Sequence, residues 1–142
     1  LKDGSRKMSK SELSDLSRIN LTDDKVQIIS KIKKAKTDPL PMPKNLEEMN
    51  QRLEAKNLIG IYASLTDSTL EKSVEIFSGK NFSDFKAKLS QILVDSIGPI
   101  SLEIKKLLSD QKYLDQILLE GVEKANLIAS KKIERIKEIV GF

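Results

Sequence analysis

Residues 83–108 read SDFKAKLSQILVDSIGPISLEIKKLL and carry the clearest secondary-structure signal in the chain. Their apolar side chains recur three or four positions apart, at Phe85, Leu89, Ile92, Leu93, Ile97, Ile100, Ile104, Leu107 and Leu108. This spacing is typical of one face of an α-helix, and Ser83 is its expected N-cap. Because the apolar period continues beyond Pro99, we expect a kink at that proline and not the end of the helix.

A second long helix is predicted on the C-terminal side, beginning near Asp110. Its apolar positions are Leu114, Ile117, Leu118, Val122, Ala125, Ile128, Ile133, Ile136 and Ile139. We interpret both sets of apolar residues as core positions. The alternation typical of a β-strand is not evident anywhere, so the sequence predicts an all-α fold, a bundle of four or five helices.

Two further helices are predicted on the N-terminal side. Asn45 can cap a helix from Leu46 to about Leu65, with Thr66–Asp67 ending it and capping the next one. That next helix is expected over about residues 69–77, ending at Ser78–Gly79, where a glycine can adopt the left-handed conformation.

The N-terminal part is predicted to hold a basic helix followed by a linker. Residues 22–36 form the expected helix, with Thr22 as N-cap. Its first turn carries Asp23 and Asp24, and its apolar face is expected to contain Val26, Ile29 and Ile32. Residues 37–45 contain prolines at alternate positions, which hold the chain extended. We therefore divide the chain into a loop segment 1–21, a basic helix 22–36, a linker 37–45 and a helical domain 46–142.

Positive charge is concentrated before and within the linker. Residues 1–45 carry eleven Lys and Arg against six Asp and Glu, whereas the remainder carries fourteen against fifteen. This asymmetry favours a polyanionic partner. The candidates for phosphate contacts are Lys31, Lys33, Lys34 and Lys36. The alternative is that these lysines form an ordinary solvated face.

The residue types that are missing exclude several classes of site. The 142 residues include neither cysteine nor histidine, which excludes disulfides, thiolate metal sites and a histidine base. The glycines are scattered, so no glycine-rich nucleotide loop is present. No carboxylate cluster predicts a dedicated metal site. Without a membrane-spanning stretch or signal peptide, a cytoplasmic location is expected.

The strongest candidate for chemistry is Lys7-Met8-Ser9-Lys10-Ser11. Two ammonium groups three residues apart, with hydroxyl groups beside them, suit a polyphosphate ligand. They could also stabilise negative charge that develops on a leaving pyrophosphate. The alternative is a basic linker without a site. Arg18 and Asn20, which follow this stretch, are candidates for loop packing or for RNA contact, and the sequence does not distinguish these roles.

Five stretches follow one another along the chain: KMSKS at 7–11, KIKKAKTD at 31–38, NLIGIY at 57–62, GKNFSDFKAKLSQILVDSIGPI at 79–100 and YLDQILLEGVEKA at 113–125. In this order they resemble the C-terminal part of bacterial tryptophanyl-tRNA synthetases, class I aminoacyl-tRNA synthetases whose second signature is KMSKS. The resemblance covers nearly the whole chain. One departure is Glu12-Leu13, which stands where the family often has Asp-Pro.

The resemblance implies an enzyme that activates L-tryptophan with ATP and transfers it to tRNA(Trp). Lys7 and Lys10 would be catalytic, residues 7–11 would bind ATP with its Mg²⁺, and residues 46–142 would be the anticodon-binding domain. The Rossmann catalytic half, with its histidine-containing HIGH signature, would precede this chain. We therefore expect a fragment that is inactive alone, from an enzyme that is a homodimer.

The competing interpretation is a non-catalytic helical interaction module with a basic N-terminal loop that binds a polyanion. This module would account for the helices and the charge, but not for the order of the five stretches. An upstream coding region of about one domain, containing a histidine-bearing signature, would favour the synthetase.

Overall fold

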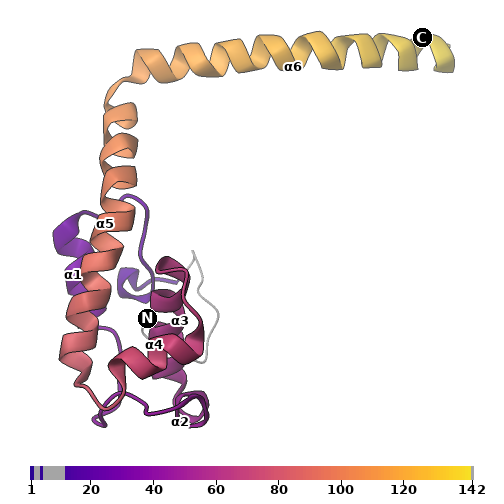
Figure 1. Ribbon diagram of the computed structural model, residues 1–142. Helices are drawn as coiled ribbons and strands as arrows, with labels where there is room; N and C mark the ends of the chain where they lie inside the picture. The colour runs from indigo at the N-terminus through magenta and orange to yellow at the C-terminus, as the bar shows by residue number, and fades with distance from the viewer. Residues whose placement is uncertain (2–3, 5–11, 142) are drawn as a thin grey trace. The chain divides into compact units, whose positions relative to one another are not determined.

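The computed structural model describes residues 1, 4 and 12–141, and no strand occurs among them (Figure 1). Its elements are the 3₁₀ helix η1 (Asp15–Ser17) and the α-helices α1 (Lys25–Lys33), α2 (Leu46–Gln51), α3 (Leu53–Leu65), α4 (Leu70–Phe77), α5 (Phe82–Ser109) and α6 (Gln111–Val140). The predicted all-α fold class is therefore confirmed.

The chain divides into two compact units, Leu1–Leu102 and Glu103–Phe142. The first unit contains η1, α1 to α4 and most of α5, and the second contains the end of α5 and the whole of α6. The basic helix α1 thus shares a unit with α2, α3 and α4. This division differs from the predicted boundaries, which assign residues 46–142 to one helical domain.

Three aromatic rings from three different helices form the centre of the first unit. Phe77 of α4 lies edge-on to Tyr62 of α3 and to Phe85 of α5, with ring centroids 4.9 Å and 4.8 Å apart. Edge-to-face pairs of this kind contribute roughly 0.5–1.5 kcal/mol each beyond the burial of their area. Around the rings lie the buried aliphatic side chains Ile28, Ile32, Met49, Leu58, Ile59, Val74, Leu89 and Leu93.

Helix α1 begins later and turns a different face inward than predicted. Its N-cap is Asp24 and not Thr22, because the Asp24 side chain and Gln27 exchange hydrogen bonds with each other's backbone N–H. Such a capping box satisfies two N–H groups that the first turn leaves unpaired. The completely buried residues of α1 are Ile28 and Ile32, whereas Val26 is 75% exposed and Ile29 is 39% exposed. Of the three residues predicted to form the buried apolar face of this helix, only Ile32 is buried.

The proline-rich segment 37–45 is packed into the first unit. Met42 is 1% exposed, and its backbone N–H donates to the Lys80 carbonyl while its own carbonyl accepts from Gly79 N–H. Gly79, which follows the end of α4, has φ +69°. This is the left-handed conformation predicted for the end of that helix. The segment therefore contributes directly to the core of the unit.

The single helix predicted over residues 46–65 is wrong, because Arg52 interrupts it with φ −122° and ψ 85°. The Arg52 guanidinium binds both carboxylate oxygens of Asp38, at 2.6 and 2.9 Å, and the Pro41 carbonyl at 2.8 Å. Glu48 Oε1 is a further acceptor at 3.1 Å. Contacts to a distant segment thus hold Arg52 outside helical geometry.

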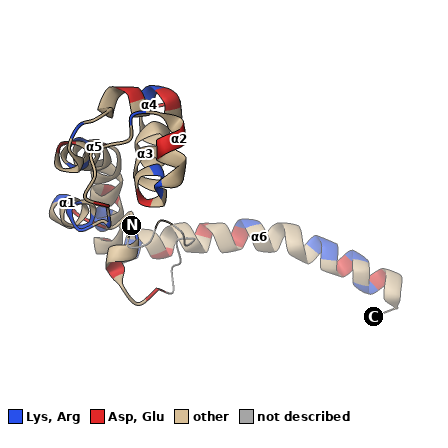
Figure 2. Cartoon of the chain, turned by 90° about the horizontal axis from the view of Figure 1, so that it is seen from below, with Lys and Arg blue, Asp and Glu red and all other residues tan. Residues whose placement is uncertain are grey.

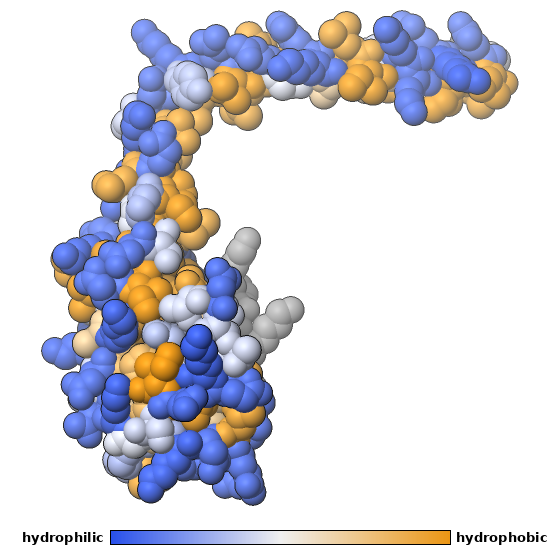
Figure 3. All heavy atoms as spheres, in the orientation of Figure 1, coloured by the Kyte–Doolittle hydropathy of each residue, from blue (hydrophilic) through white to orange (hydrophobic). Residues whose placement is uncertain are grey.

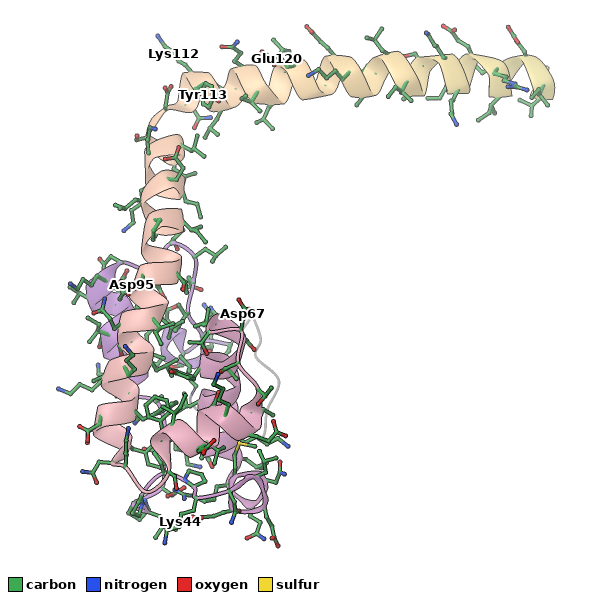
Figure 4. The ribbon with its side chains drawn as sticks, viewed as in Figure 1. Lys44, Asp67, Asp95, Lys112, Tyr113 and Glu120 are labelled. Atoms are coloured by element: carbon green, nitrogen blue, oxygen red, sulfur yellow. The ribbon has the colours of Figure 1, made fainter. Side chains whose placement is uncertain are left out.

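The remaining caps follow the predictions only in part. Asn45 caps α2 as predicted, accepting from Glu48 N–H, and Asp110 caps α6 by accepting from Tyr113 N–H. The cap of α4 is Thr69 and not Asp67, which lies in the preceding turn with φ 49° (Figure 4). Ser83 lies inside α5 and is not its cap, since that helix begins at Phe82.

The apolar residues of α5 and α6 differ in burial. In α5, Phe85, Leu89 and Leu93 are buried, and the helix continues past Pro99 as predicted. In α6, by contrast, none of the described residues is buried. Apolar side chains lie among polar ones along its surface (Figure 3). The prediction that the apolar positions of α6 are core positions is therefore wrong for this chain. Within the described residues, no helix is both long and apolar enough to cross a membrane.

Candidate functional site

The predicted ATP-binding stretch, Lys7, Met8, Ser9, Lys10 and Ser11, lies outside the described residues. The structure does describe the residues that flank it in the sequence. Gly4 precedes Lys7 by three residues, and Glu12 directly follows Ser11. The candidate site is therefore built from the residues that hold these two flanking positions.

Gly4 packs against the backbone at the start of α3. A Cβ atom added to Gly4 would lie 2.8 Å from the carbonyl carbon and oxygen of Leu53 and 2.9 Å from the nitrogen of Glu54. Backbone atoms of a helix cannot rotate away as a flexible side chain can, so a larger residue would force the two segments apart. The close approach requires glycine at this position.

Arg18 holds the other flank. Its Nη1 donates to the Glu12 carbonyl oxygen at 2.9 Å, and its Nε donates to Asn20 Oδ1 at 3.1 Å. Its Nη2 lies 3.5 Å from Asp15 Oδ1. A guanidinium is planar and directs its donors in fixed directions. Arg18 therefore links the backbone at Glu12 to polar groups of Asp15 and Asn20.

These polar groups belong to a cluster around a buried lysine of α1. Lys31 is 4% exposed, and its Nζ lies 2.6 Å from Asp23 Oδ2 and 2.6 Å from Asp15 Oδ2. Asn20 donates through its backbone N–H to Asp23 Oδ2 at 2.9 Å and through Nδ2 to Asp15 Oδ1 at 2.8 Å. An unpaired ammonium would be costly in this environment, so the two carboxylates make the burial of Lys31 possible.

The ionisation of the cluster follows from these contacts. Burial opposes the charged form of Lys31, but its hydrogen bonds to Asp15 and Asp23 outweigh burial and raise the pKa of Lys31 above its ordinary value. The hydrogen bond from Lys31 lowers the pKa of Asp15, with a smaller effect from Asn20. Lys31 and Asp15 therefore stabilise each other's ionised forms.

The four lysines predicted to contact phosphates lie in different environments. The buried ammonium of Lys31 is engaged by two carboxylates, which argues against a phosphate contact by this residue. Lys33 and Lys34 are exposed at the C-terminal end of α1. Lys36 is also exposed, and its Nζ lies 2.9 Å from Glu54 Oε1. In the cartoon of Figure 2, helix α1 carries Lys and Arg positions in blue, whereas Asp and Glu positions in red are visible on α2 and α4.

A groove of about 600 Å³ lies in the first unit between α1 and the beginning of α5. Its lining includes Ile29 and Lys33 of α1 and Phe82, Lys86 and Ser90 of α5, and no acidic side chain is among the described residues that form it. Lys86 Nζ donates to the Ala35 carbonyl at 2.7 Å, and burial lowers the pKa of Lys86. The groove combines apolar surface with positive charge.

No metal site is found in the described part of the chain, where no group of three acidic side chains could hold an ion. Exposed lysines such as Lys33 and Lys34 do offer ammonium donors on the first unit. These donors suit phosphate-bearing ligands.

Comparison with known proteins agrees with this chemistry. A family model described as tRNA synthetases class I (W and Y) matches residues 1–95, about two thirds of the chain. The chain belongs to this synthetase family. Residues 7–11 and both flanking positions fall within the matched region. The family prediction made from the five stretches is thereby confirmed.

Curated relatives extend the similarity of this synthetase chain to all of its residues. It is 48% identical over 142 residues to a tryptophan–tRNA ligase of Agrobacterium fabrum, covering 40% of that protein. It is 46% identical to one of Caulobacter vibrioides, covering 41%, and 44% identical to one of Rickettsia felis, covering 42%. The chain thus spans about 40% of the length of these curated relatives.

Sequence reasoning about this synthetase chain did not identify the cluster around Lys31. Asp15, Asp23 and Lys31 share no short motif, and Asp23 and Lys31 are eight residues apart. The apolar neighbours of Lys31 were the available signal, because they place it on the same face as Ile28 and Ile32. The described contacts of Arg18 and Asn20 are to neighbouring residues, which supports the loop-packing alternative for both.

Proposed function

We propose that the full-length protein is a tryptophan–tRNA ligase. In the first step a carboxylate oxygen of L-tryptophan attacks the α-phosphorus of ATP, and pyrophosphate leaves. In the second step the tryptophanyl group passes from the adenylate to a terminal ribose hydroxyl of tRNA(Trp), and AMP leaves. The observation that carries this proposal is the similarity of all 142 residues to proteins with that name.

Within this reaction we assign Lys7 and Lys10 to the ATP phosphates. Their ammonium groups would stabilise the negative charge that accumulates on the leaving pyrophosphate. Met8, Ser9 and Ser11 would complete the ATP-binding stretch, and the Mg²⁺ that accompanies ATP would arrive with the substrate. Since the chain spans only part of its relatives, we expect this fragment to be inactive alone. We also propose that the full-length enzyme is a homodimer and that it is located in the cytoplasm.

The helical part of the chain would bind tRNA. Exposed Lys33, Lys34 and Lys36 are the candidates for phosphate contacts, and the groove beside α1 adds an apolar, positively charged surface next to Lys33. Phosphate contacts by lysines weaken steeply with salt and carry no sequence information. Recognition of the anticodon would come from other residues of this helical region.

Tryptophan-dependent exchange between ATP and pyrophosphate, measured on the full-length protein, tests the activation step. We expect exchange by the wild type and a fall of at least about a hundredfold in kcat for Lys10→Ala, with tryptophan affinity nearly unchanged. Absence of tryptophan-dependent exchange in the wild type would refute the proposed activity. An unchanged kcat for Lys10→Ala would remove the assigned role of that lysine.

Binding of tRNA by the 142-residue chain tests the second assignment. The matched ligands are tRNA(Trp) and the same tRNA with an altered anticodon, each at two salt concentrations. Selective loss with the altered anticodon would support an anticodon reader within this chain. Equal, salt-sensitive binding of both RNAs would leave only phosphate contacts.

A further inference from the structure

We propose that one face of α6 binds a second copy of this chain, so that two α6 helices pair in antiparallel orientation. The inference goes beyond the proposed function and does not depend on it, because it concerns only the 142-residue chain. It is argued from the arrangement of apolar side chains around α6, from their exposure and from the distribution of charge along the helix.

Apolar side chains gather on one side of α6. Successive residues of an α-helix are about 100° apart, so positions separated by three or four residues fall on the same side. One arc of about 100° contains Leu114, Leu118, Val122, Ala125, Ile133 and Ile136, and these residues are called the α6 face. An apolar arc of this width is typical of a helix that packs against another element.

The α6 face has no covering partner in the structure. None of the described residues of α6 is buried, and Leu118, Ile133 and Ile136 are each more than half exposed. The helix has 30 residues, which corresponds to a length of about 45 Å. Apolar side chains are visible along this length in Figure 3. A continuous exposed apolar surface of this kind marks an interaction site.

The charge along α6 favours a second copy as the partner, in antiparallel orientation. Residues 111–123 carry three acidic side chains and one basic, whereas residues 124–140 carry two acidic and five basic. In Figure 2 the basic positions are frequent toward the C-terminal end of the helix. Antiparallel pairing lays the acidic part of each copy beside the basic part of the other, whereas parallel pairing would bring like charges together.

Lys132 supports the same orientation, because it lies within the arc of the α6 face. In a parallel pair the two copies of Lys132 would oppose each other at the centre of the interface. An antiparallel pair centred near Ala125 instead brings Lys132 to the level of Leu118 of the other copy. Its aliphatic stem can then cover apolar surface while the ammonium group reaches water.

A pair of opposite charges sets the register at the edge of the α6 face. Asp115 and Lys137 are 22 residues apart, so they lie on the same edge of the helix, within about 40° of each other. In the antiparallel pair, Asp115 of each copy lies beside Lys137 of the other. The two-fold symmetry of such a dimer makes this contact twice.

The competing explanation is that another part of the same polypeptide covers the α6 face, in which case the chain would stay monomeric. Each copy contributes a single helix, and the interface includes the charged Lys132. We therefore expect a weak dimer, with a dissociation constant on the order of 100 µM. Unfolding measured at about 5 µM would then report mainly on the monomer.

Sedimentation equilibrium of the 142-residue chain, from about 10 µM to about 1 mM, tests the proposal. The matched variants are Ile136→Ser on the α6 face and Leu127→Ser, whose side chains are 57% and 66% exposed. The two positions are nine residues apart and therefore lie on opposite sides of the helix. We expect Ile136→Ser to weaken dimerisation at least about tenfold, because each dimer loses two apolar side chains, and Leu127→Ser to change it by less than about twofold.

Circular dichroism at 222 nm verifies that each variant retains its helix content. A chain that stays monomeric over the whole concentration range would overturn the proposal and would leave the proposed ligase activity unaffected. Equal effects of Ile136→Ser and Leu127→Ser would also overturn it, because association would then not depend on the α6 face.

Exchanging the charges of Asp115 and Lys137 tests the orientation. Asp115→Lys alone and Lys137→Glu alone each place like charges together twice in the antiparallel dimer, so each should weaken it at least about fivefold. The double variant restores opposite charges and should return the dissociation constant to within about twofold of the wild type. Additive losses in the double variant would overturn the antiparallel pairing.

Discussion

The beginning of α5 and the whole of α6 carry apolar residues with the same helical period but have opposite environments. In α5, Phe85 and Leu89 are completely buried, whereas in α6 Ile117 is 47% exposed and Ile136 is 57% exposed. Both segments are helical, so the period specifies helix in each case. Burial requires partners from other segments, and α3 and α4 supply them to Phe85 through Tyr62 and Phe77.

The largest effect expected from this comparison is that of removing a ring from the core. Phe85→Ala in the 142-residue chain should lower the free energy of unfolding by about 4 kcal/mol, because it creates a cavity between two other rings. Ile117→Ala in α6 should change it by less than about 1 kcal/mol. Urea unfolding monitored by circular dichroism measures both.

The milder variant Phe85→Leu keeps the measurement possible if the alanine variant fails to fold. An Ile117→Ala effect as large as that of the core variant would show that α6 is buried in solution. The difference drawn between α5 and α6 would then not hold.

Charged pairs should show a similar contrast, with a somewhat smaller effect. Lys31→Met leaves Asp23 buried without its partner, so unfolding free energy should fall by about 3 kcal/mol. Lys106→Met removes an exposed contact to Glu103 at 3.5 Å, with side chains 76% and 58% exposed, and should cost less than about 0.5 kcal/mol. Urea midpoints at equal m-values test this pair. Equal losses would mean that the Lys31 cluster is accessible to water.

Acid should act through the carboxylates of the first unit. The hydrogen bond from Lys31 holds the pKa of Asp15 below its ordinary value of 3.8. Burial opposes a similar decrease for Asp38, but its hydrogen bond from Arg52 outweighs burial, and the pKa of Asp38 is lowered as well. Because both are lower in the folded state, their stabilising contribution is complete above about pH 4 and is lost as the pH falls through the folded pKa values.

The matching measurement is urea unfolding at pH 7 and pH 3, for the wild type and for Lys31→Met. The variant should lose less stability on acidification than the wild type, since Asp15 no longer has its partner. The contribution of Asp38 should remain in both proteins. An identical acid dependence would contradict the role assigned to the Lys31–Asp15 contact.

Replacing glycine by alanine should change the free energy of unfolding in opposite directions at Gly4 in the first unit and at Gly121 in α6. Gly4→Ala places a Cβ atom 2.8 Å from backbone atoms of Leu53 and should cost about 1–3 kcal/mol. Gly121→Ala in α6 meets no atom within 4 Å and should stabilise that helix by up to about 1 kcal/mol, through helix propensity. Thermal unfolding followed at 222 nm reports both variants. A neutral Gly4→Ala would contradict the close approach of residue 4 to α3.

Several features of the fold were accessible from local sequence patterns. The N-cap Asn45, the start of the last helix near Asp110 and the left-handed Gly79 were predicted correctly, because each depends on residues within one helical turn. The interruption at Arg52 was not predictable in this way. It depends on Asp38, fourteen residues earlier in the chain, and no periodic signal connects these positions.

The candidate site likewise has features that the sequence predicted and features that only the structure showed. The order of five short stretches identified the synthetase family, and the proposed binding of the ATP phosphates by Lys7 and Lys10 rests on the same resemblance. The flanking contacts were beyond such reasoning, since Gly4 meets α3 and the Lys31 cluster joins residues eight or more positions apart. Lys31 itself resembles its exposed neighbours in the sequence and differs from them only through the carboxylates that surround it.

Helical character, some helix-ending residues such as Asn45 and Gly79, and family membership thus depend on short-range signals, which the amino-acid order contains directly. Which apolar face is buried and which lysine is paired depend on residues that folding brings together from distant positions. The physical reason is that hydrophobic burial and the desolvation of charge are set by the whole environment of a side chain. Helix propensity and capping, by contrast, act within about one turn.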